Sequence, residues 1–385
     1  MKVLVLDQIA SVNYKYSFSL ANALKDAGAQ VEMVIDTEAD ASYCRCPVTR
    51  RFSTARKDIG KLRKALNYLS AWRFVYKKAV REGFDVVHLQ WFDLSPADAY
   101  YIRKLRKKGV HPVAGVHDIL PMHQRRFDPF FYRLIYRFCD RIYVQAQANV
   151  ARFSALFPED KQKLSLIPHG HFLDFAAPVP KAQARKALGI PEDRTVFLFF
   201  GQIKKVKGLD LLLSAFGSLQ QKRSDLFLIV AGNVWKDDFS VYQDQIGRLG
   251  LGDDCLRADI RYIPEEELSL YFSASDLCVL PYRDVYQSGV LQLVYAYEKP
   301  PVASRIPSFL ELVREGETGY LFDVGSEESL SLALERAAGD RERWAALGQR
   351  GQALVRQALS WDRIAGQVLA LYQEAVGAPK ERRTP

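Results

Sequence analysis

The chain of 385 residues is 48% hydrophobic and 26% charged, which excludes a disordered protein and predicts two globular domains, because one ordinary core does not accommodate this length. The net charge of +9 is concentrated in the first half, where residues 1–175 hold 28 Lys and Arg against 17 Asp and Glu. The longest apolar runs, 195–200 and 226–231, are far shorter than the ~20 residues of a membrane-spanning helix.

Short β-branched strands alternate with helical patterns along the first half of the chain. The first ten residues contain an apolar run of only four before Asp7, so they predict a first strand and not a signal peptide. The expected strands of this half are 2–6, 31–35, 85–89, 112–116 and 141–145.

The segment 50–80 has the pattern of an amphipathic helix with a cationic face. Apolar residues recur at three- and four-residue spacing with lysines between them: Ile59, Leu62, Leu66, Leu69 and Trp72, with Lys57, Lys61, Lys64 and Lys78. A second basic run at 103–108, and Arg125 with Arg126, add to the charge. Solvated helix faces account for this pattern, and so does docking on anionic lipid, where each Lys or Arg contributes about 1 kcal/mol.

A second set of strands and helices follows, so the chain is expected to be α/β with two doubly wound domains. Its strands are expected at 195–201, 226–232, 256–263, 276–282, 300–304 and 319–322. The proline-containing stretch 171–183 is the expected seam. We therefore predict an N-terminal domain at 1–177, a C-terminal domain at 178–358, an amphipathic helix at 359–376 and a tail at 377–385.

The five cysteines, an odd number in a long chain, predict a reducing compartment and no disulfide framework. Cys44 and Cys46 form a C-x-C pair, but no second Cys or His cluster completes a metal site.

Loops that follow strands are where a doubly wound sheet binds its ligand. One such loop runs from Gly201 through Lys204, Lys205 and Lys207 to Gly208, where a helix is expected to begin. Lysines at the end of a strand reach a phosphate as point charges, although a solvated lysine cluster is the plainer interpretation.

A second strand-end loop leads into a helix that starts with Gln287, Ser288 and Gly289. Free backbone N–H groups and the helix dipole favour an anion at such a start, and glycine permits close approach. A cationic loop and a bare helix N-terminus on one sheet together predict a clamp for a diphosphate.

Four ordered segments resemble the C-terminal half of the family-4 retaining nucleotide-sugar glycosyltransferases (group 1 glycosyltransferases): 199–216, 262–304, 309–322 and 360–372. Three segments of the first half are more loosely similar: "FDVVHLQW" at 84–91, "VAGVHDILP" at 113–121 and "LSLIPHGHF" at 164–172. The resemblance implies the GT-B fold, in which two Rossmann-like domains face a cleft and a C-terminal helix crosses back to the first domain. It also implies that the nucleotide sugar binds mainly to the C-terminal domain and the acceptor mainly to the N-terminal one.

The resemblance assigns Lys207 to the lysine of the family's K-G motif and makes Lys204 the candidate companion cation, because Gln202 occupies the usual arginine position. Both would neutralise charge on the departing diphosphate, so neither a divalent metal nor another cofactor is expected. Gly201, Gln287, Ser288, Gly289 and Val290 complete the expected diphosphate site.

His117 matches the histidine that lies beside the donor sugar in this family, and Asp118 follows it at a strand end. Capping of the next helix is the alternative role for this pair. Glu311 matches a common family glutamate, with a structural role equally open, and Arg261, Tyr262 and Ile263 lie where the family contacts the base.

The departure from the family lies around the helix that follows residue 288. Two family glutamates, one near the donor sugar and one near the ribose, are replaced by Val285 and Leu293. Asp284 is a candidate substitute for the first, and Gln292 for the second, although it is one position and so about 100° away on a helix.

These features predict a metal-independent, retaining hexosyltransferase that uses a UDP-sugar or GDP-sugar. The basic first half suggests a polyprenyl-linked or other glycan acceptor at the inner face of the cytoplasmic membrane, in polysaccharide biosynthesis. A non-catalytic GT-B protein that binds a nucleotide or glycan, a GT-B epimerase and a phosphorylase remain alternatives. Nucleic-acid binding is not expected, because the cations lie on amphipathic helices without an aromatic platform on strands.

Overall fold

The computed structural model describes residues 1–54, 56, 58–92, 95–120, 126–234, 238–285 and 288–377. The chain divides into two compact units, residues 1–170 together with 359–385, and residues 171–358. Each unit contains a parallel sheet of its own and is described by itself.

The first unit is built on a seven-stranded parallel sheet in the order β3-β2-β1-β4-β5-β6-β7. The strands are β1 (Lys2–Asp7), β2 (Gln30–Asp36), β3 (Val48–Phe52), β4 (Val86–Leu89), β5 (His111–Val116), β6 (Arg141–Val144) and β7 (Leu164–Leu166). The helices are α1 (Ala10–Asp26), α2 (Lys61–Arg81), α3 (Ser95–Lys107), α4 (Asp128–Phe138), α5 (Gln147–Leu156), η1 (Pro158–Lys163) and α14 (Trp361–Gly377).

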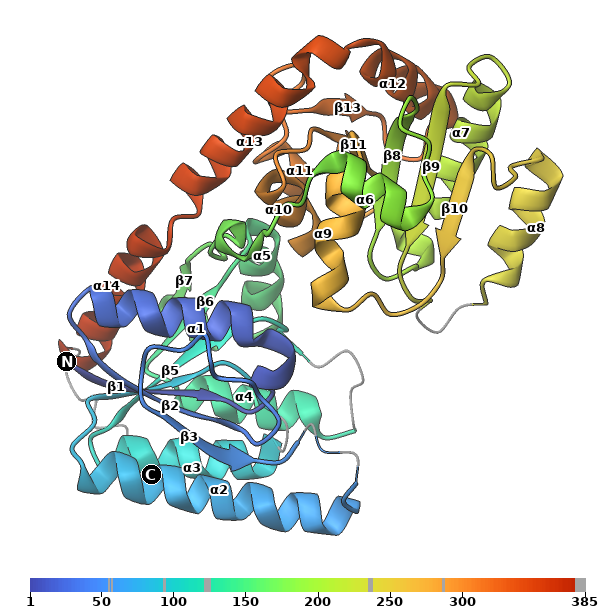
Figure 1. Cartoon of the computed structure of the whole chain (residues 1–385). Helices are drawn as coiled ribbons and strands as arrows, with labels where there is room; N and C mark the ends of the chain where they lie inside the picture. Colours follow the sequence, from blue (N-terminus) through green and yellow to red (C-terminus); the bar gives the residue numbers. More distant parts are fainter. Residues whose placement is uncertain are drawn as a thin grey trace. The chain divides into compact units, whose positions relative to one another are not determined.

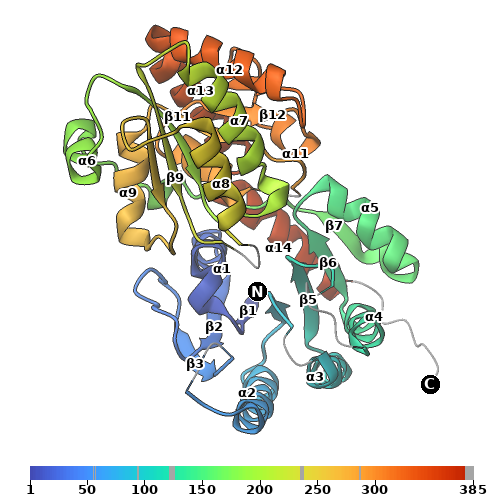
Figure 2. The ribbon, with the colours of Figure 1, turned by 90° about the vertical axis from the view of Figure 1, so that its right-hand side faces the viewer.

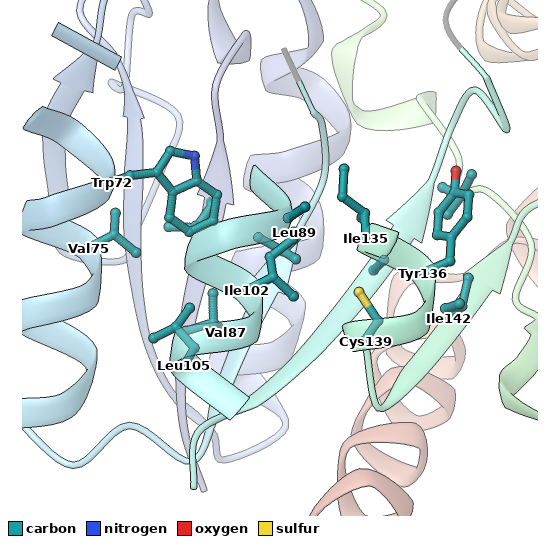
Figure 3. Packing of buried hydrophobic residues seen from close by; sticks show 14 of the residues in the cluster. Trp72, Val75, Val87, Leu89, Ile102, Leu105, Ile135, Tyr136, Cys139 and Ile142 are labelled. Carbon is teal, nitrogen blue, oxygen red and sulfur yellow. The ribbon is translucent and has the colours of Figure 1, made fainter. Parts of the chain in front are cut away.

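Helices cover both faces of this sheet (Figures 1 and 2). On one face α1 packs against α14, which also contacts β5 and β6, so the C-terminal helix is part of the first unit. On the other face α3 lies between α2 and α4, and their side chains interdigitate with those of the strands (Figure 3). Because both faces of the sheet are covered, its central strands are near-continuous runs of apolar residues.

The second unit is built on a six-stranded parallel sheet in the order β10-β9-β8-β11-β12-β13. The strands are β8 (Thr195–Phe200), β9 (Leu226–Ala231), β10 (Leu256–Asp259), β11 (Leu277–Leu280), β12 (Pro301–Ser304) and β13 (Tyr320–Phe322). The helices are η2 (Leu173–Phe175), α6 (Lys181–Leu188), η3 (Lys205–Lys207), α7 (Leu209–Gln220), α8 (Ser240–Leu249), α9 (Glu265–Ala274), α10 (Gly289–Ala296), α11 (Pro307–Leu310), α12 (Glu327–Gly339), η4 (Arg341–Arg343) and α13 (Trp344–Ala358). On one side of the sheet α7 packs between α8 and α12, and on the other α6 packs against α9 (Figure 1).

Both strand orders reverse once, and the reversal defines where a ligand is expected. In the first unit the chain turns outward in opposite directions from β1 and β4, and in the second from β8 and β11. Open α/β sheets bind ligands at the carboxyl ends of the strands that flank such a reversal. The loops after β1, β4, β8 and β11 are therefore the places to examine.

The structure corrects several element predictions. β3 lies within and before the basic segment expected to be helical from residue 50, and α2 begins only at Lys61. β7 was not predicted as a strand, and β10 ends at Asp259, so 260–263 form a loop. Both additional strands are short edge strands, in which periodicity is weakest.

The predicted domain boundary after residue 177 differs from the division of the structure, which falls after Gly170. The physical reason is that η2, which precedes residue 177, packs against α10 of the second unit. The short stretch 171–177 therefore belongs to the second unit.

The apolar face expected for α2 is wrong. Its buried residues are Tyr68, Ala71, Trp72, Val75 and Ala79, and of the residues predicted for that face only Trp72 is buried. Tyr68 and Trp72 both donate hydrogen bonds to Asp98 of α3, at 2.6 and 2.8 Å, and this contact determines which face of α2 turns inward. Leu62, Leu66 and Leu69 remain exposed by 77%, 58% and 41%.

Within the described ranges, every helix falls short of the length and apolar character that a bilayer crossing demands.

Candidate functional site

Two glycines let backbone segments meet at the carboxyl edge of the second unit's sheet. Gly208 has φ +68°, and a Cβ there would overlap the carbonyl oxygen of Pro281, which follows β11. Gly232, which follows β9, packs in the same way on the carbonyl of Gly201, which follows β8. The loops after β8 and β11 are therefore in backbone contact, which side chains at these positions would prevent.

This contact brings together residues of both predicted motifs. A Cβ on Gly201 would lie 3.2 Å from Lys207 Nζ and 3.2 Å from Val290 Cγ2 of α10. Lys207 Nζ also lies 4.9 Å from the centre of the Tyr282 ring, a cation–π contact. The K-G loop and the start of α10 thus form one site.

The ammonium group of Lys207 is held in an unfavourable environment. Burial, and to a lesser extent the charge of Lys204, lower the pKa of Lys207 to about 8. A dianionic ligand would reverse both effects by replacing lost hydration and opposing the second cation. Such a perturbed lysine at a strand end is a mark of a ligand site.

The N-terminus of α10 is only partly satisfied by the helix itself. Ser288 is the N-cap, and its hydroxyl accepts a hydrogen bond from the Leu291 N–H at 3.2 Å. The first-turn N–H groups of Gly289 and Val290 are not used by the helix and suit an anion. Gln287, predicted to take part, lies outside the described residues.

The face of α10 that carries Gly289 and Val290 also carries Leu293, which is half-buried. Gln292 is 8% exposed, and its buried Oε1 has no hydrogen-bond partner among the residues that the structure describes. It lies about 100° around the helix from Leu293, and its role as a substitute for the ribose-binding glutamate stays a prediction. Asp284 is exposed and directly precedes the half-buried Val285.

Of the residues predicted to contact the base, together with Glu311, all but Ile263 lie at the surface. Arg261 and Tyr262 are exposed in the loop after β10, where Arg261 forms an ion pair with Glu267, and Ile263 is buried. Glu311 is exposed directly after α11.

In the first unit, His117 follows β5 and contacts Gln90, Trp91 and Tyr16. Its Nε2 hydrogen-bonds Gln90 Oε1 at 2.8 Å. The Trp91 ring stacks on the imidazole at 4.6 Å with an interplanar angle of 9°, and Tyr16 meets it edge-on at 4.8 Å. Gln90 and Trp91 follow β4, so this cluster lies at the strand-order reversal.

Three histidines in this part of the first unit are neutral at physiological pH. Burial lowers the pKa of His117 and of His88 to about 3, and that of His169 to about 4. For His117 the neighbouring His169 and His88 act in the same direction, and a hydrogen bond to Gln145 opposes them. The first-unit site therefore offers neutral hydrogen-bonding groups, in contrast to the cationic site of the second unit.

Asp118 is exposed at the surface. Partial desolvation by the surrounding protein nevertheless raises the pKa of its carboxyl group, and the charge of Arg152 acts in the opposite direction. The next helix, α4, begins only at Asp128 with Phe127 as its N-cap residue. Asp118 therefore does not cap α4, the next helix in the described part of the chain.

Comparison with known families follows the same division. The model for glycosyl transferases group 1 matches residues 180–354, and the model for glycosyltransferase family 4 matches residues 15–175. The chain belongs to the family-4, group 1 glycosyltransferases. Both halves of this family's pattern are therefore present in one chain.

Relatives of this family 4 member include a lipopolysaccharide 1,2-N-acetylglucosaminetransferase of Salmonella typhimurium, 30% identical over 210 residues, 52% of this chain and 54% of that protein. The chain spans about half the length of the curated relatives it matches.

Solved structures show the same fold. Sucrose-phosphate synthase from Thermosynechococcus elongatus matches with a TM-score of 0.73 at 20% identity, over 98% of this chain and 100% of that one. Anabaena HepE in complex with UDP matches with a TM-score of 0.70 at 18% identity, over 96% and 99%. The fold is GT-B.

Three residues of this family 4 protein join the sites without having been predicted. The buried amide of Gln8, directly after β1, and the indole N–H of Trp91 have no hydrogen-bond partner in the described part of the chain. Tyr282 lies beneath Lys207 with its pKa raised by burial, so its hydroxyl stays protonated. Gln8 and Trp91 follow a predicted strand by two residues and Tyr282 ends one, which is the signal that would have found them.

In the ranges that the structure covers, no three His, Cys, Asp or Glu side chains gather in a metal-binding arrangement. All five cysteines are free thiols.

Replacing Lys207 by Met is expected to stabilise the unliganded protein and to impair ligand binding. Removal of a buried cation recovers about 1–3 kcal/mol of unfolding free energy at pH 7. The loss of a charge aimed at the diphosphate should lower turnover by roughly 10²-fold. Urea denaturation and donor turnover measure the two effects. Lys205→Met, in the same turn but exposed, is the control and should change neither; equal effects of both variants would contradict the role of Lys207.

Affinity for a nucleoside diphosphate should depend on pH above about 8. In the free protein Lys207 loses its proton near that value, and a bound diphosphate raises its pKa, so binding takes up a proton. Affinity should be constant below pH 8 and fall by up to about tenfold per pH unit above it. Calorimetry in buffers of different ionisation enthalpy measures the uptake, which Lys207→Met should abolish. Constant affinity up to about pH 10 would refute the assignment.

Proposed function

We propose that this protein is a retaining, metal-independent glycosyltransferase that transfers a hexose from a nucleoside diphosphate sugar to a saccharide acceptor. The observation that best supports this proposal is that Gly201, Lys207 and the first turn of α10 meet at the strand-order reversal of the second unit. HepE, which shares the fold, binds UDP, which makes a UDP-sugar the first donor to test.

In the proposed reaction, the bond between the anomeric carbon and the diphosphate oxygen breaks while an acceptor hydroxyl attacks from the same face. The acceptor proton passes to the leaving phosphate oxygen, so no protein base is needed. Lys207, Lys204 and the N–H groups of Gly289 and Val290 neutralise the charge that develops on the diphosphate, a task that a divalent metal would otherwise perform.

The first unit suits a neutral saccharide. The amide of Gln8 and the indole N–H of Trp91, which have no hydrogen-bond partner within the described ranges of the chain, are proposed to bind sugar hydroxyls, and the Trp91 ring stacks on that of His117. His117 is proposed to lie beside the donor sugar, with Asp118 next to it.

The proposal is tested with a panel of UDP-, GDP- and ADP-sugars. A donor at 100 times its dissociation constant should stabilise the protein by about 2.7 kcal/mol in thermal unfolding. Hydrolysis or transfer should continue in EDTA, and NMR of the product should show the anomeric configuration of the donor. Lys207→Met is the inactive control.

Each alternative function has its own outcome. Stabilisation without turnover, even with acceptor, indicates a non-catalytic binding protein, and a changed sugar on recovered donor indicates an epimerase. Sugar phosphate formed with inorganic phosphate indicates a phosphorylase. No stabilisation by any nucleotide sugar would end the proposal.

We further propose that the acceptor is lipid-linked, for example through polyprenyl phosphate, and that the protein docks on an anionic membrane surface through α2. This helix carries seven Lys and Arg and no Asp or Glu. With about 100° per residue, Leu62, Leu66 and Leu69 form one exposed line, flanked by Arg63 and other cations. Exposed leucines beside cations are typical of helices that lie in a membrane interface.

The docking surface is tested by flotation with vesicles of phosphatidylglycerol and of phosphatidylcholine. The wild type should bind the anionic vesicles only, and serine at Leu62, Leu66 and Leu69 should reduce binding by at least about tenfold, because each buried leucine contributes about 1.5–3 kcal/mol. A control with serine at three exposed positions elsewhere, Val241, Leu332 and Val376, should bind like the wild type.

Two results would refute membrane docking. One is absence of binding to anionic vesicles at low salt. The other is a wild-type dimer that becomes monomeric in the leucine variant, which would make this face a contact between two copies.

A further inference from the structure

A chain of buried hydrogen bonds runs through the first unit from α14 to His117. The hydroxyl of Tyr372 lies 2.6 Å from His88 Nδ1. His88 Nε2 lies 3.3 Å from Gln90 Nε2, and Gln90 Oε1 lies 2.8 Å from His117 Nε2. His88 and Gln90 are 0% and 1% exposed, so water does not compete for these contacts.

This series of hydrogen-bonded side chains occupies space that is open only because residue 115 is a glycine. A Cβ on Gly115 of β5 would lie 2.5 Å from the Tyr143 hydroxyl and 3.1 Å from His88 Nε2. The Tyr143 hydroxyl in turn lies 3.2 Å from His88 Nε2 and 2.9 Å from the hydroxyl of Tyr16. The two histidines are thus held within a fully packed polar cluster.

The chemistry of the amide couples the two histidines. Gln90 presents one acceptor and one donor, each to an imidazole Nε2. Both imidazole rings are neutral, so each ring carries one proton. The Nε2 that faces the amide oxygen of Gln90 must be protonated, and the Nε2 that faces the amide NH2 must not be. With Oε1 toward His117, the His117 proton lies on Nε2, and the His88 proton lies on Nδ1, where it is donated to Tyr372.

We propose that Gln90 is a positioning residue that, together with His88 and Tyr372, holds His117 as its Nε2–H tautomer. In this tautomer Nδ1 is the acceptor atom of the ring, and Gln145, which also hydrogen-bonds His117, is the second amide that bears on its protonation. Trp91 and Tyr16 fix the plane of the ring, whereas Gln90 fixes its protonation. The inference rests on the proposed function in assigning His117 a place beside the donor sugar, but the coupling itself does not.

Long-range 1H–15N NMR of the histidine-labelled protein tests the coupling directly. In the wild type, His117 should be protonated on Nε2 and His88 on Nδ1. A carboxylate in Gln90→Glu accepts from both rings, so His88 should switch to Nε2–H while His117 keeps its tautomer. Gln90→Leu should leave His117 as a mixture. Any other wild-type pattern, or an unchanged His88 in Gln90→Glu, overturns the proposal, and the wild-type spectrum decides even if a variant does not fold.

A double-mutant cycle tests the effect on the reaction. Gln90→Leu should lower kcat/KM by roughly 10- to 100-fold, as expected for a misplaced reactive group. In a His117→Ala background the same change should cost less than about twofold, because the effect passes through His117. Nucleotide affinity should stay within about twofold of the wild type. If Gln90→Leu lowers kcat/KM by the same factor in the wild-type and His117→Ala backgrounds, the positioning role is overturned.

Failure of the proposed function gives a different result. If His117→Ala retains full transfer activity, the place assigned to His117 is wrong, whereas the tautomer pattern still decides the coupling.

Discussion

Close approach of backbone segments at the carboxyl edge of the second sheet is the constraint on which the rest depends. Gly208 against Pro281 and Gly232 against Gly201 bring the loops after β8 and β11 into contact. Only this contact places the Lys207 ammonium between the Tyr282 ring and the start of α10. The same closeness removes water from Lys207, so the geometry that forms an anion site also destabilises the charged form of that lysine.

The two units share the doubly wound architecture but differ in the charge of the groups at their strand ends. The second unit opposes negative charge with lysines and N–H groups, whereas the first surrounds its strand ends with neutral imidazoles, amides and stacked rings. Burial produces both results, because it lowers the pKa of lysine only to about 8 but that of His117 to about 3. The proposed transfer requires both chemistries, a cationic site for the leaving group and a neutral one for the saccharide.

Helix α2 shows how one amphipathic pattern serves two surfaces. Its aromatic and small residues turn toward the sheet because Tyr68 and Trp72 bind Asp98, and the leucines are left outside among cations. In a helix with apolar residues on two sides, periodicity alone does not say which side is buried. The partner helix α3 decides, and the periodicity of α2 carries no information about it.

The sequence by itself determined the α/β class, most strands, the strand-end loops and the family, because these depend on local periodicity and on motifs such as Lys207-Gly208. It did not reveal β3, β7, the inner face of α2, the burial of Gln292 or the cluster around His117. Only the tertiary structure decided these, since they arise from edge pairing, helical rotation and contacts such as His88 with Tyr372, which join residues far apart in the chain.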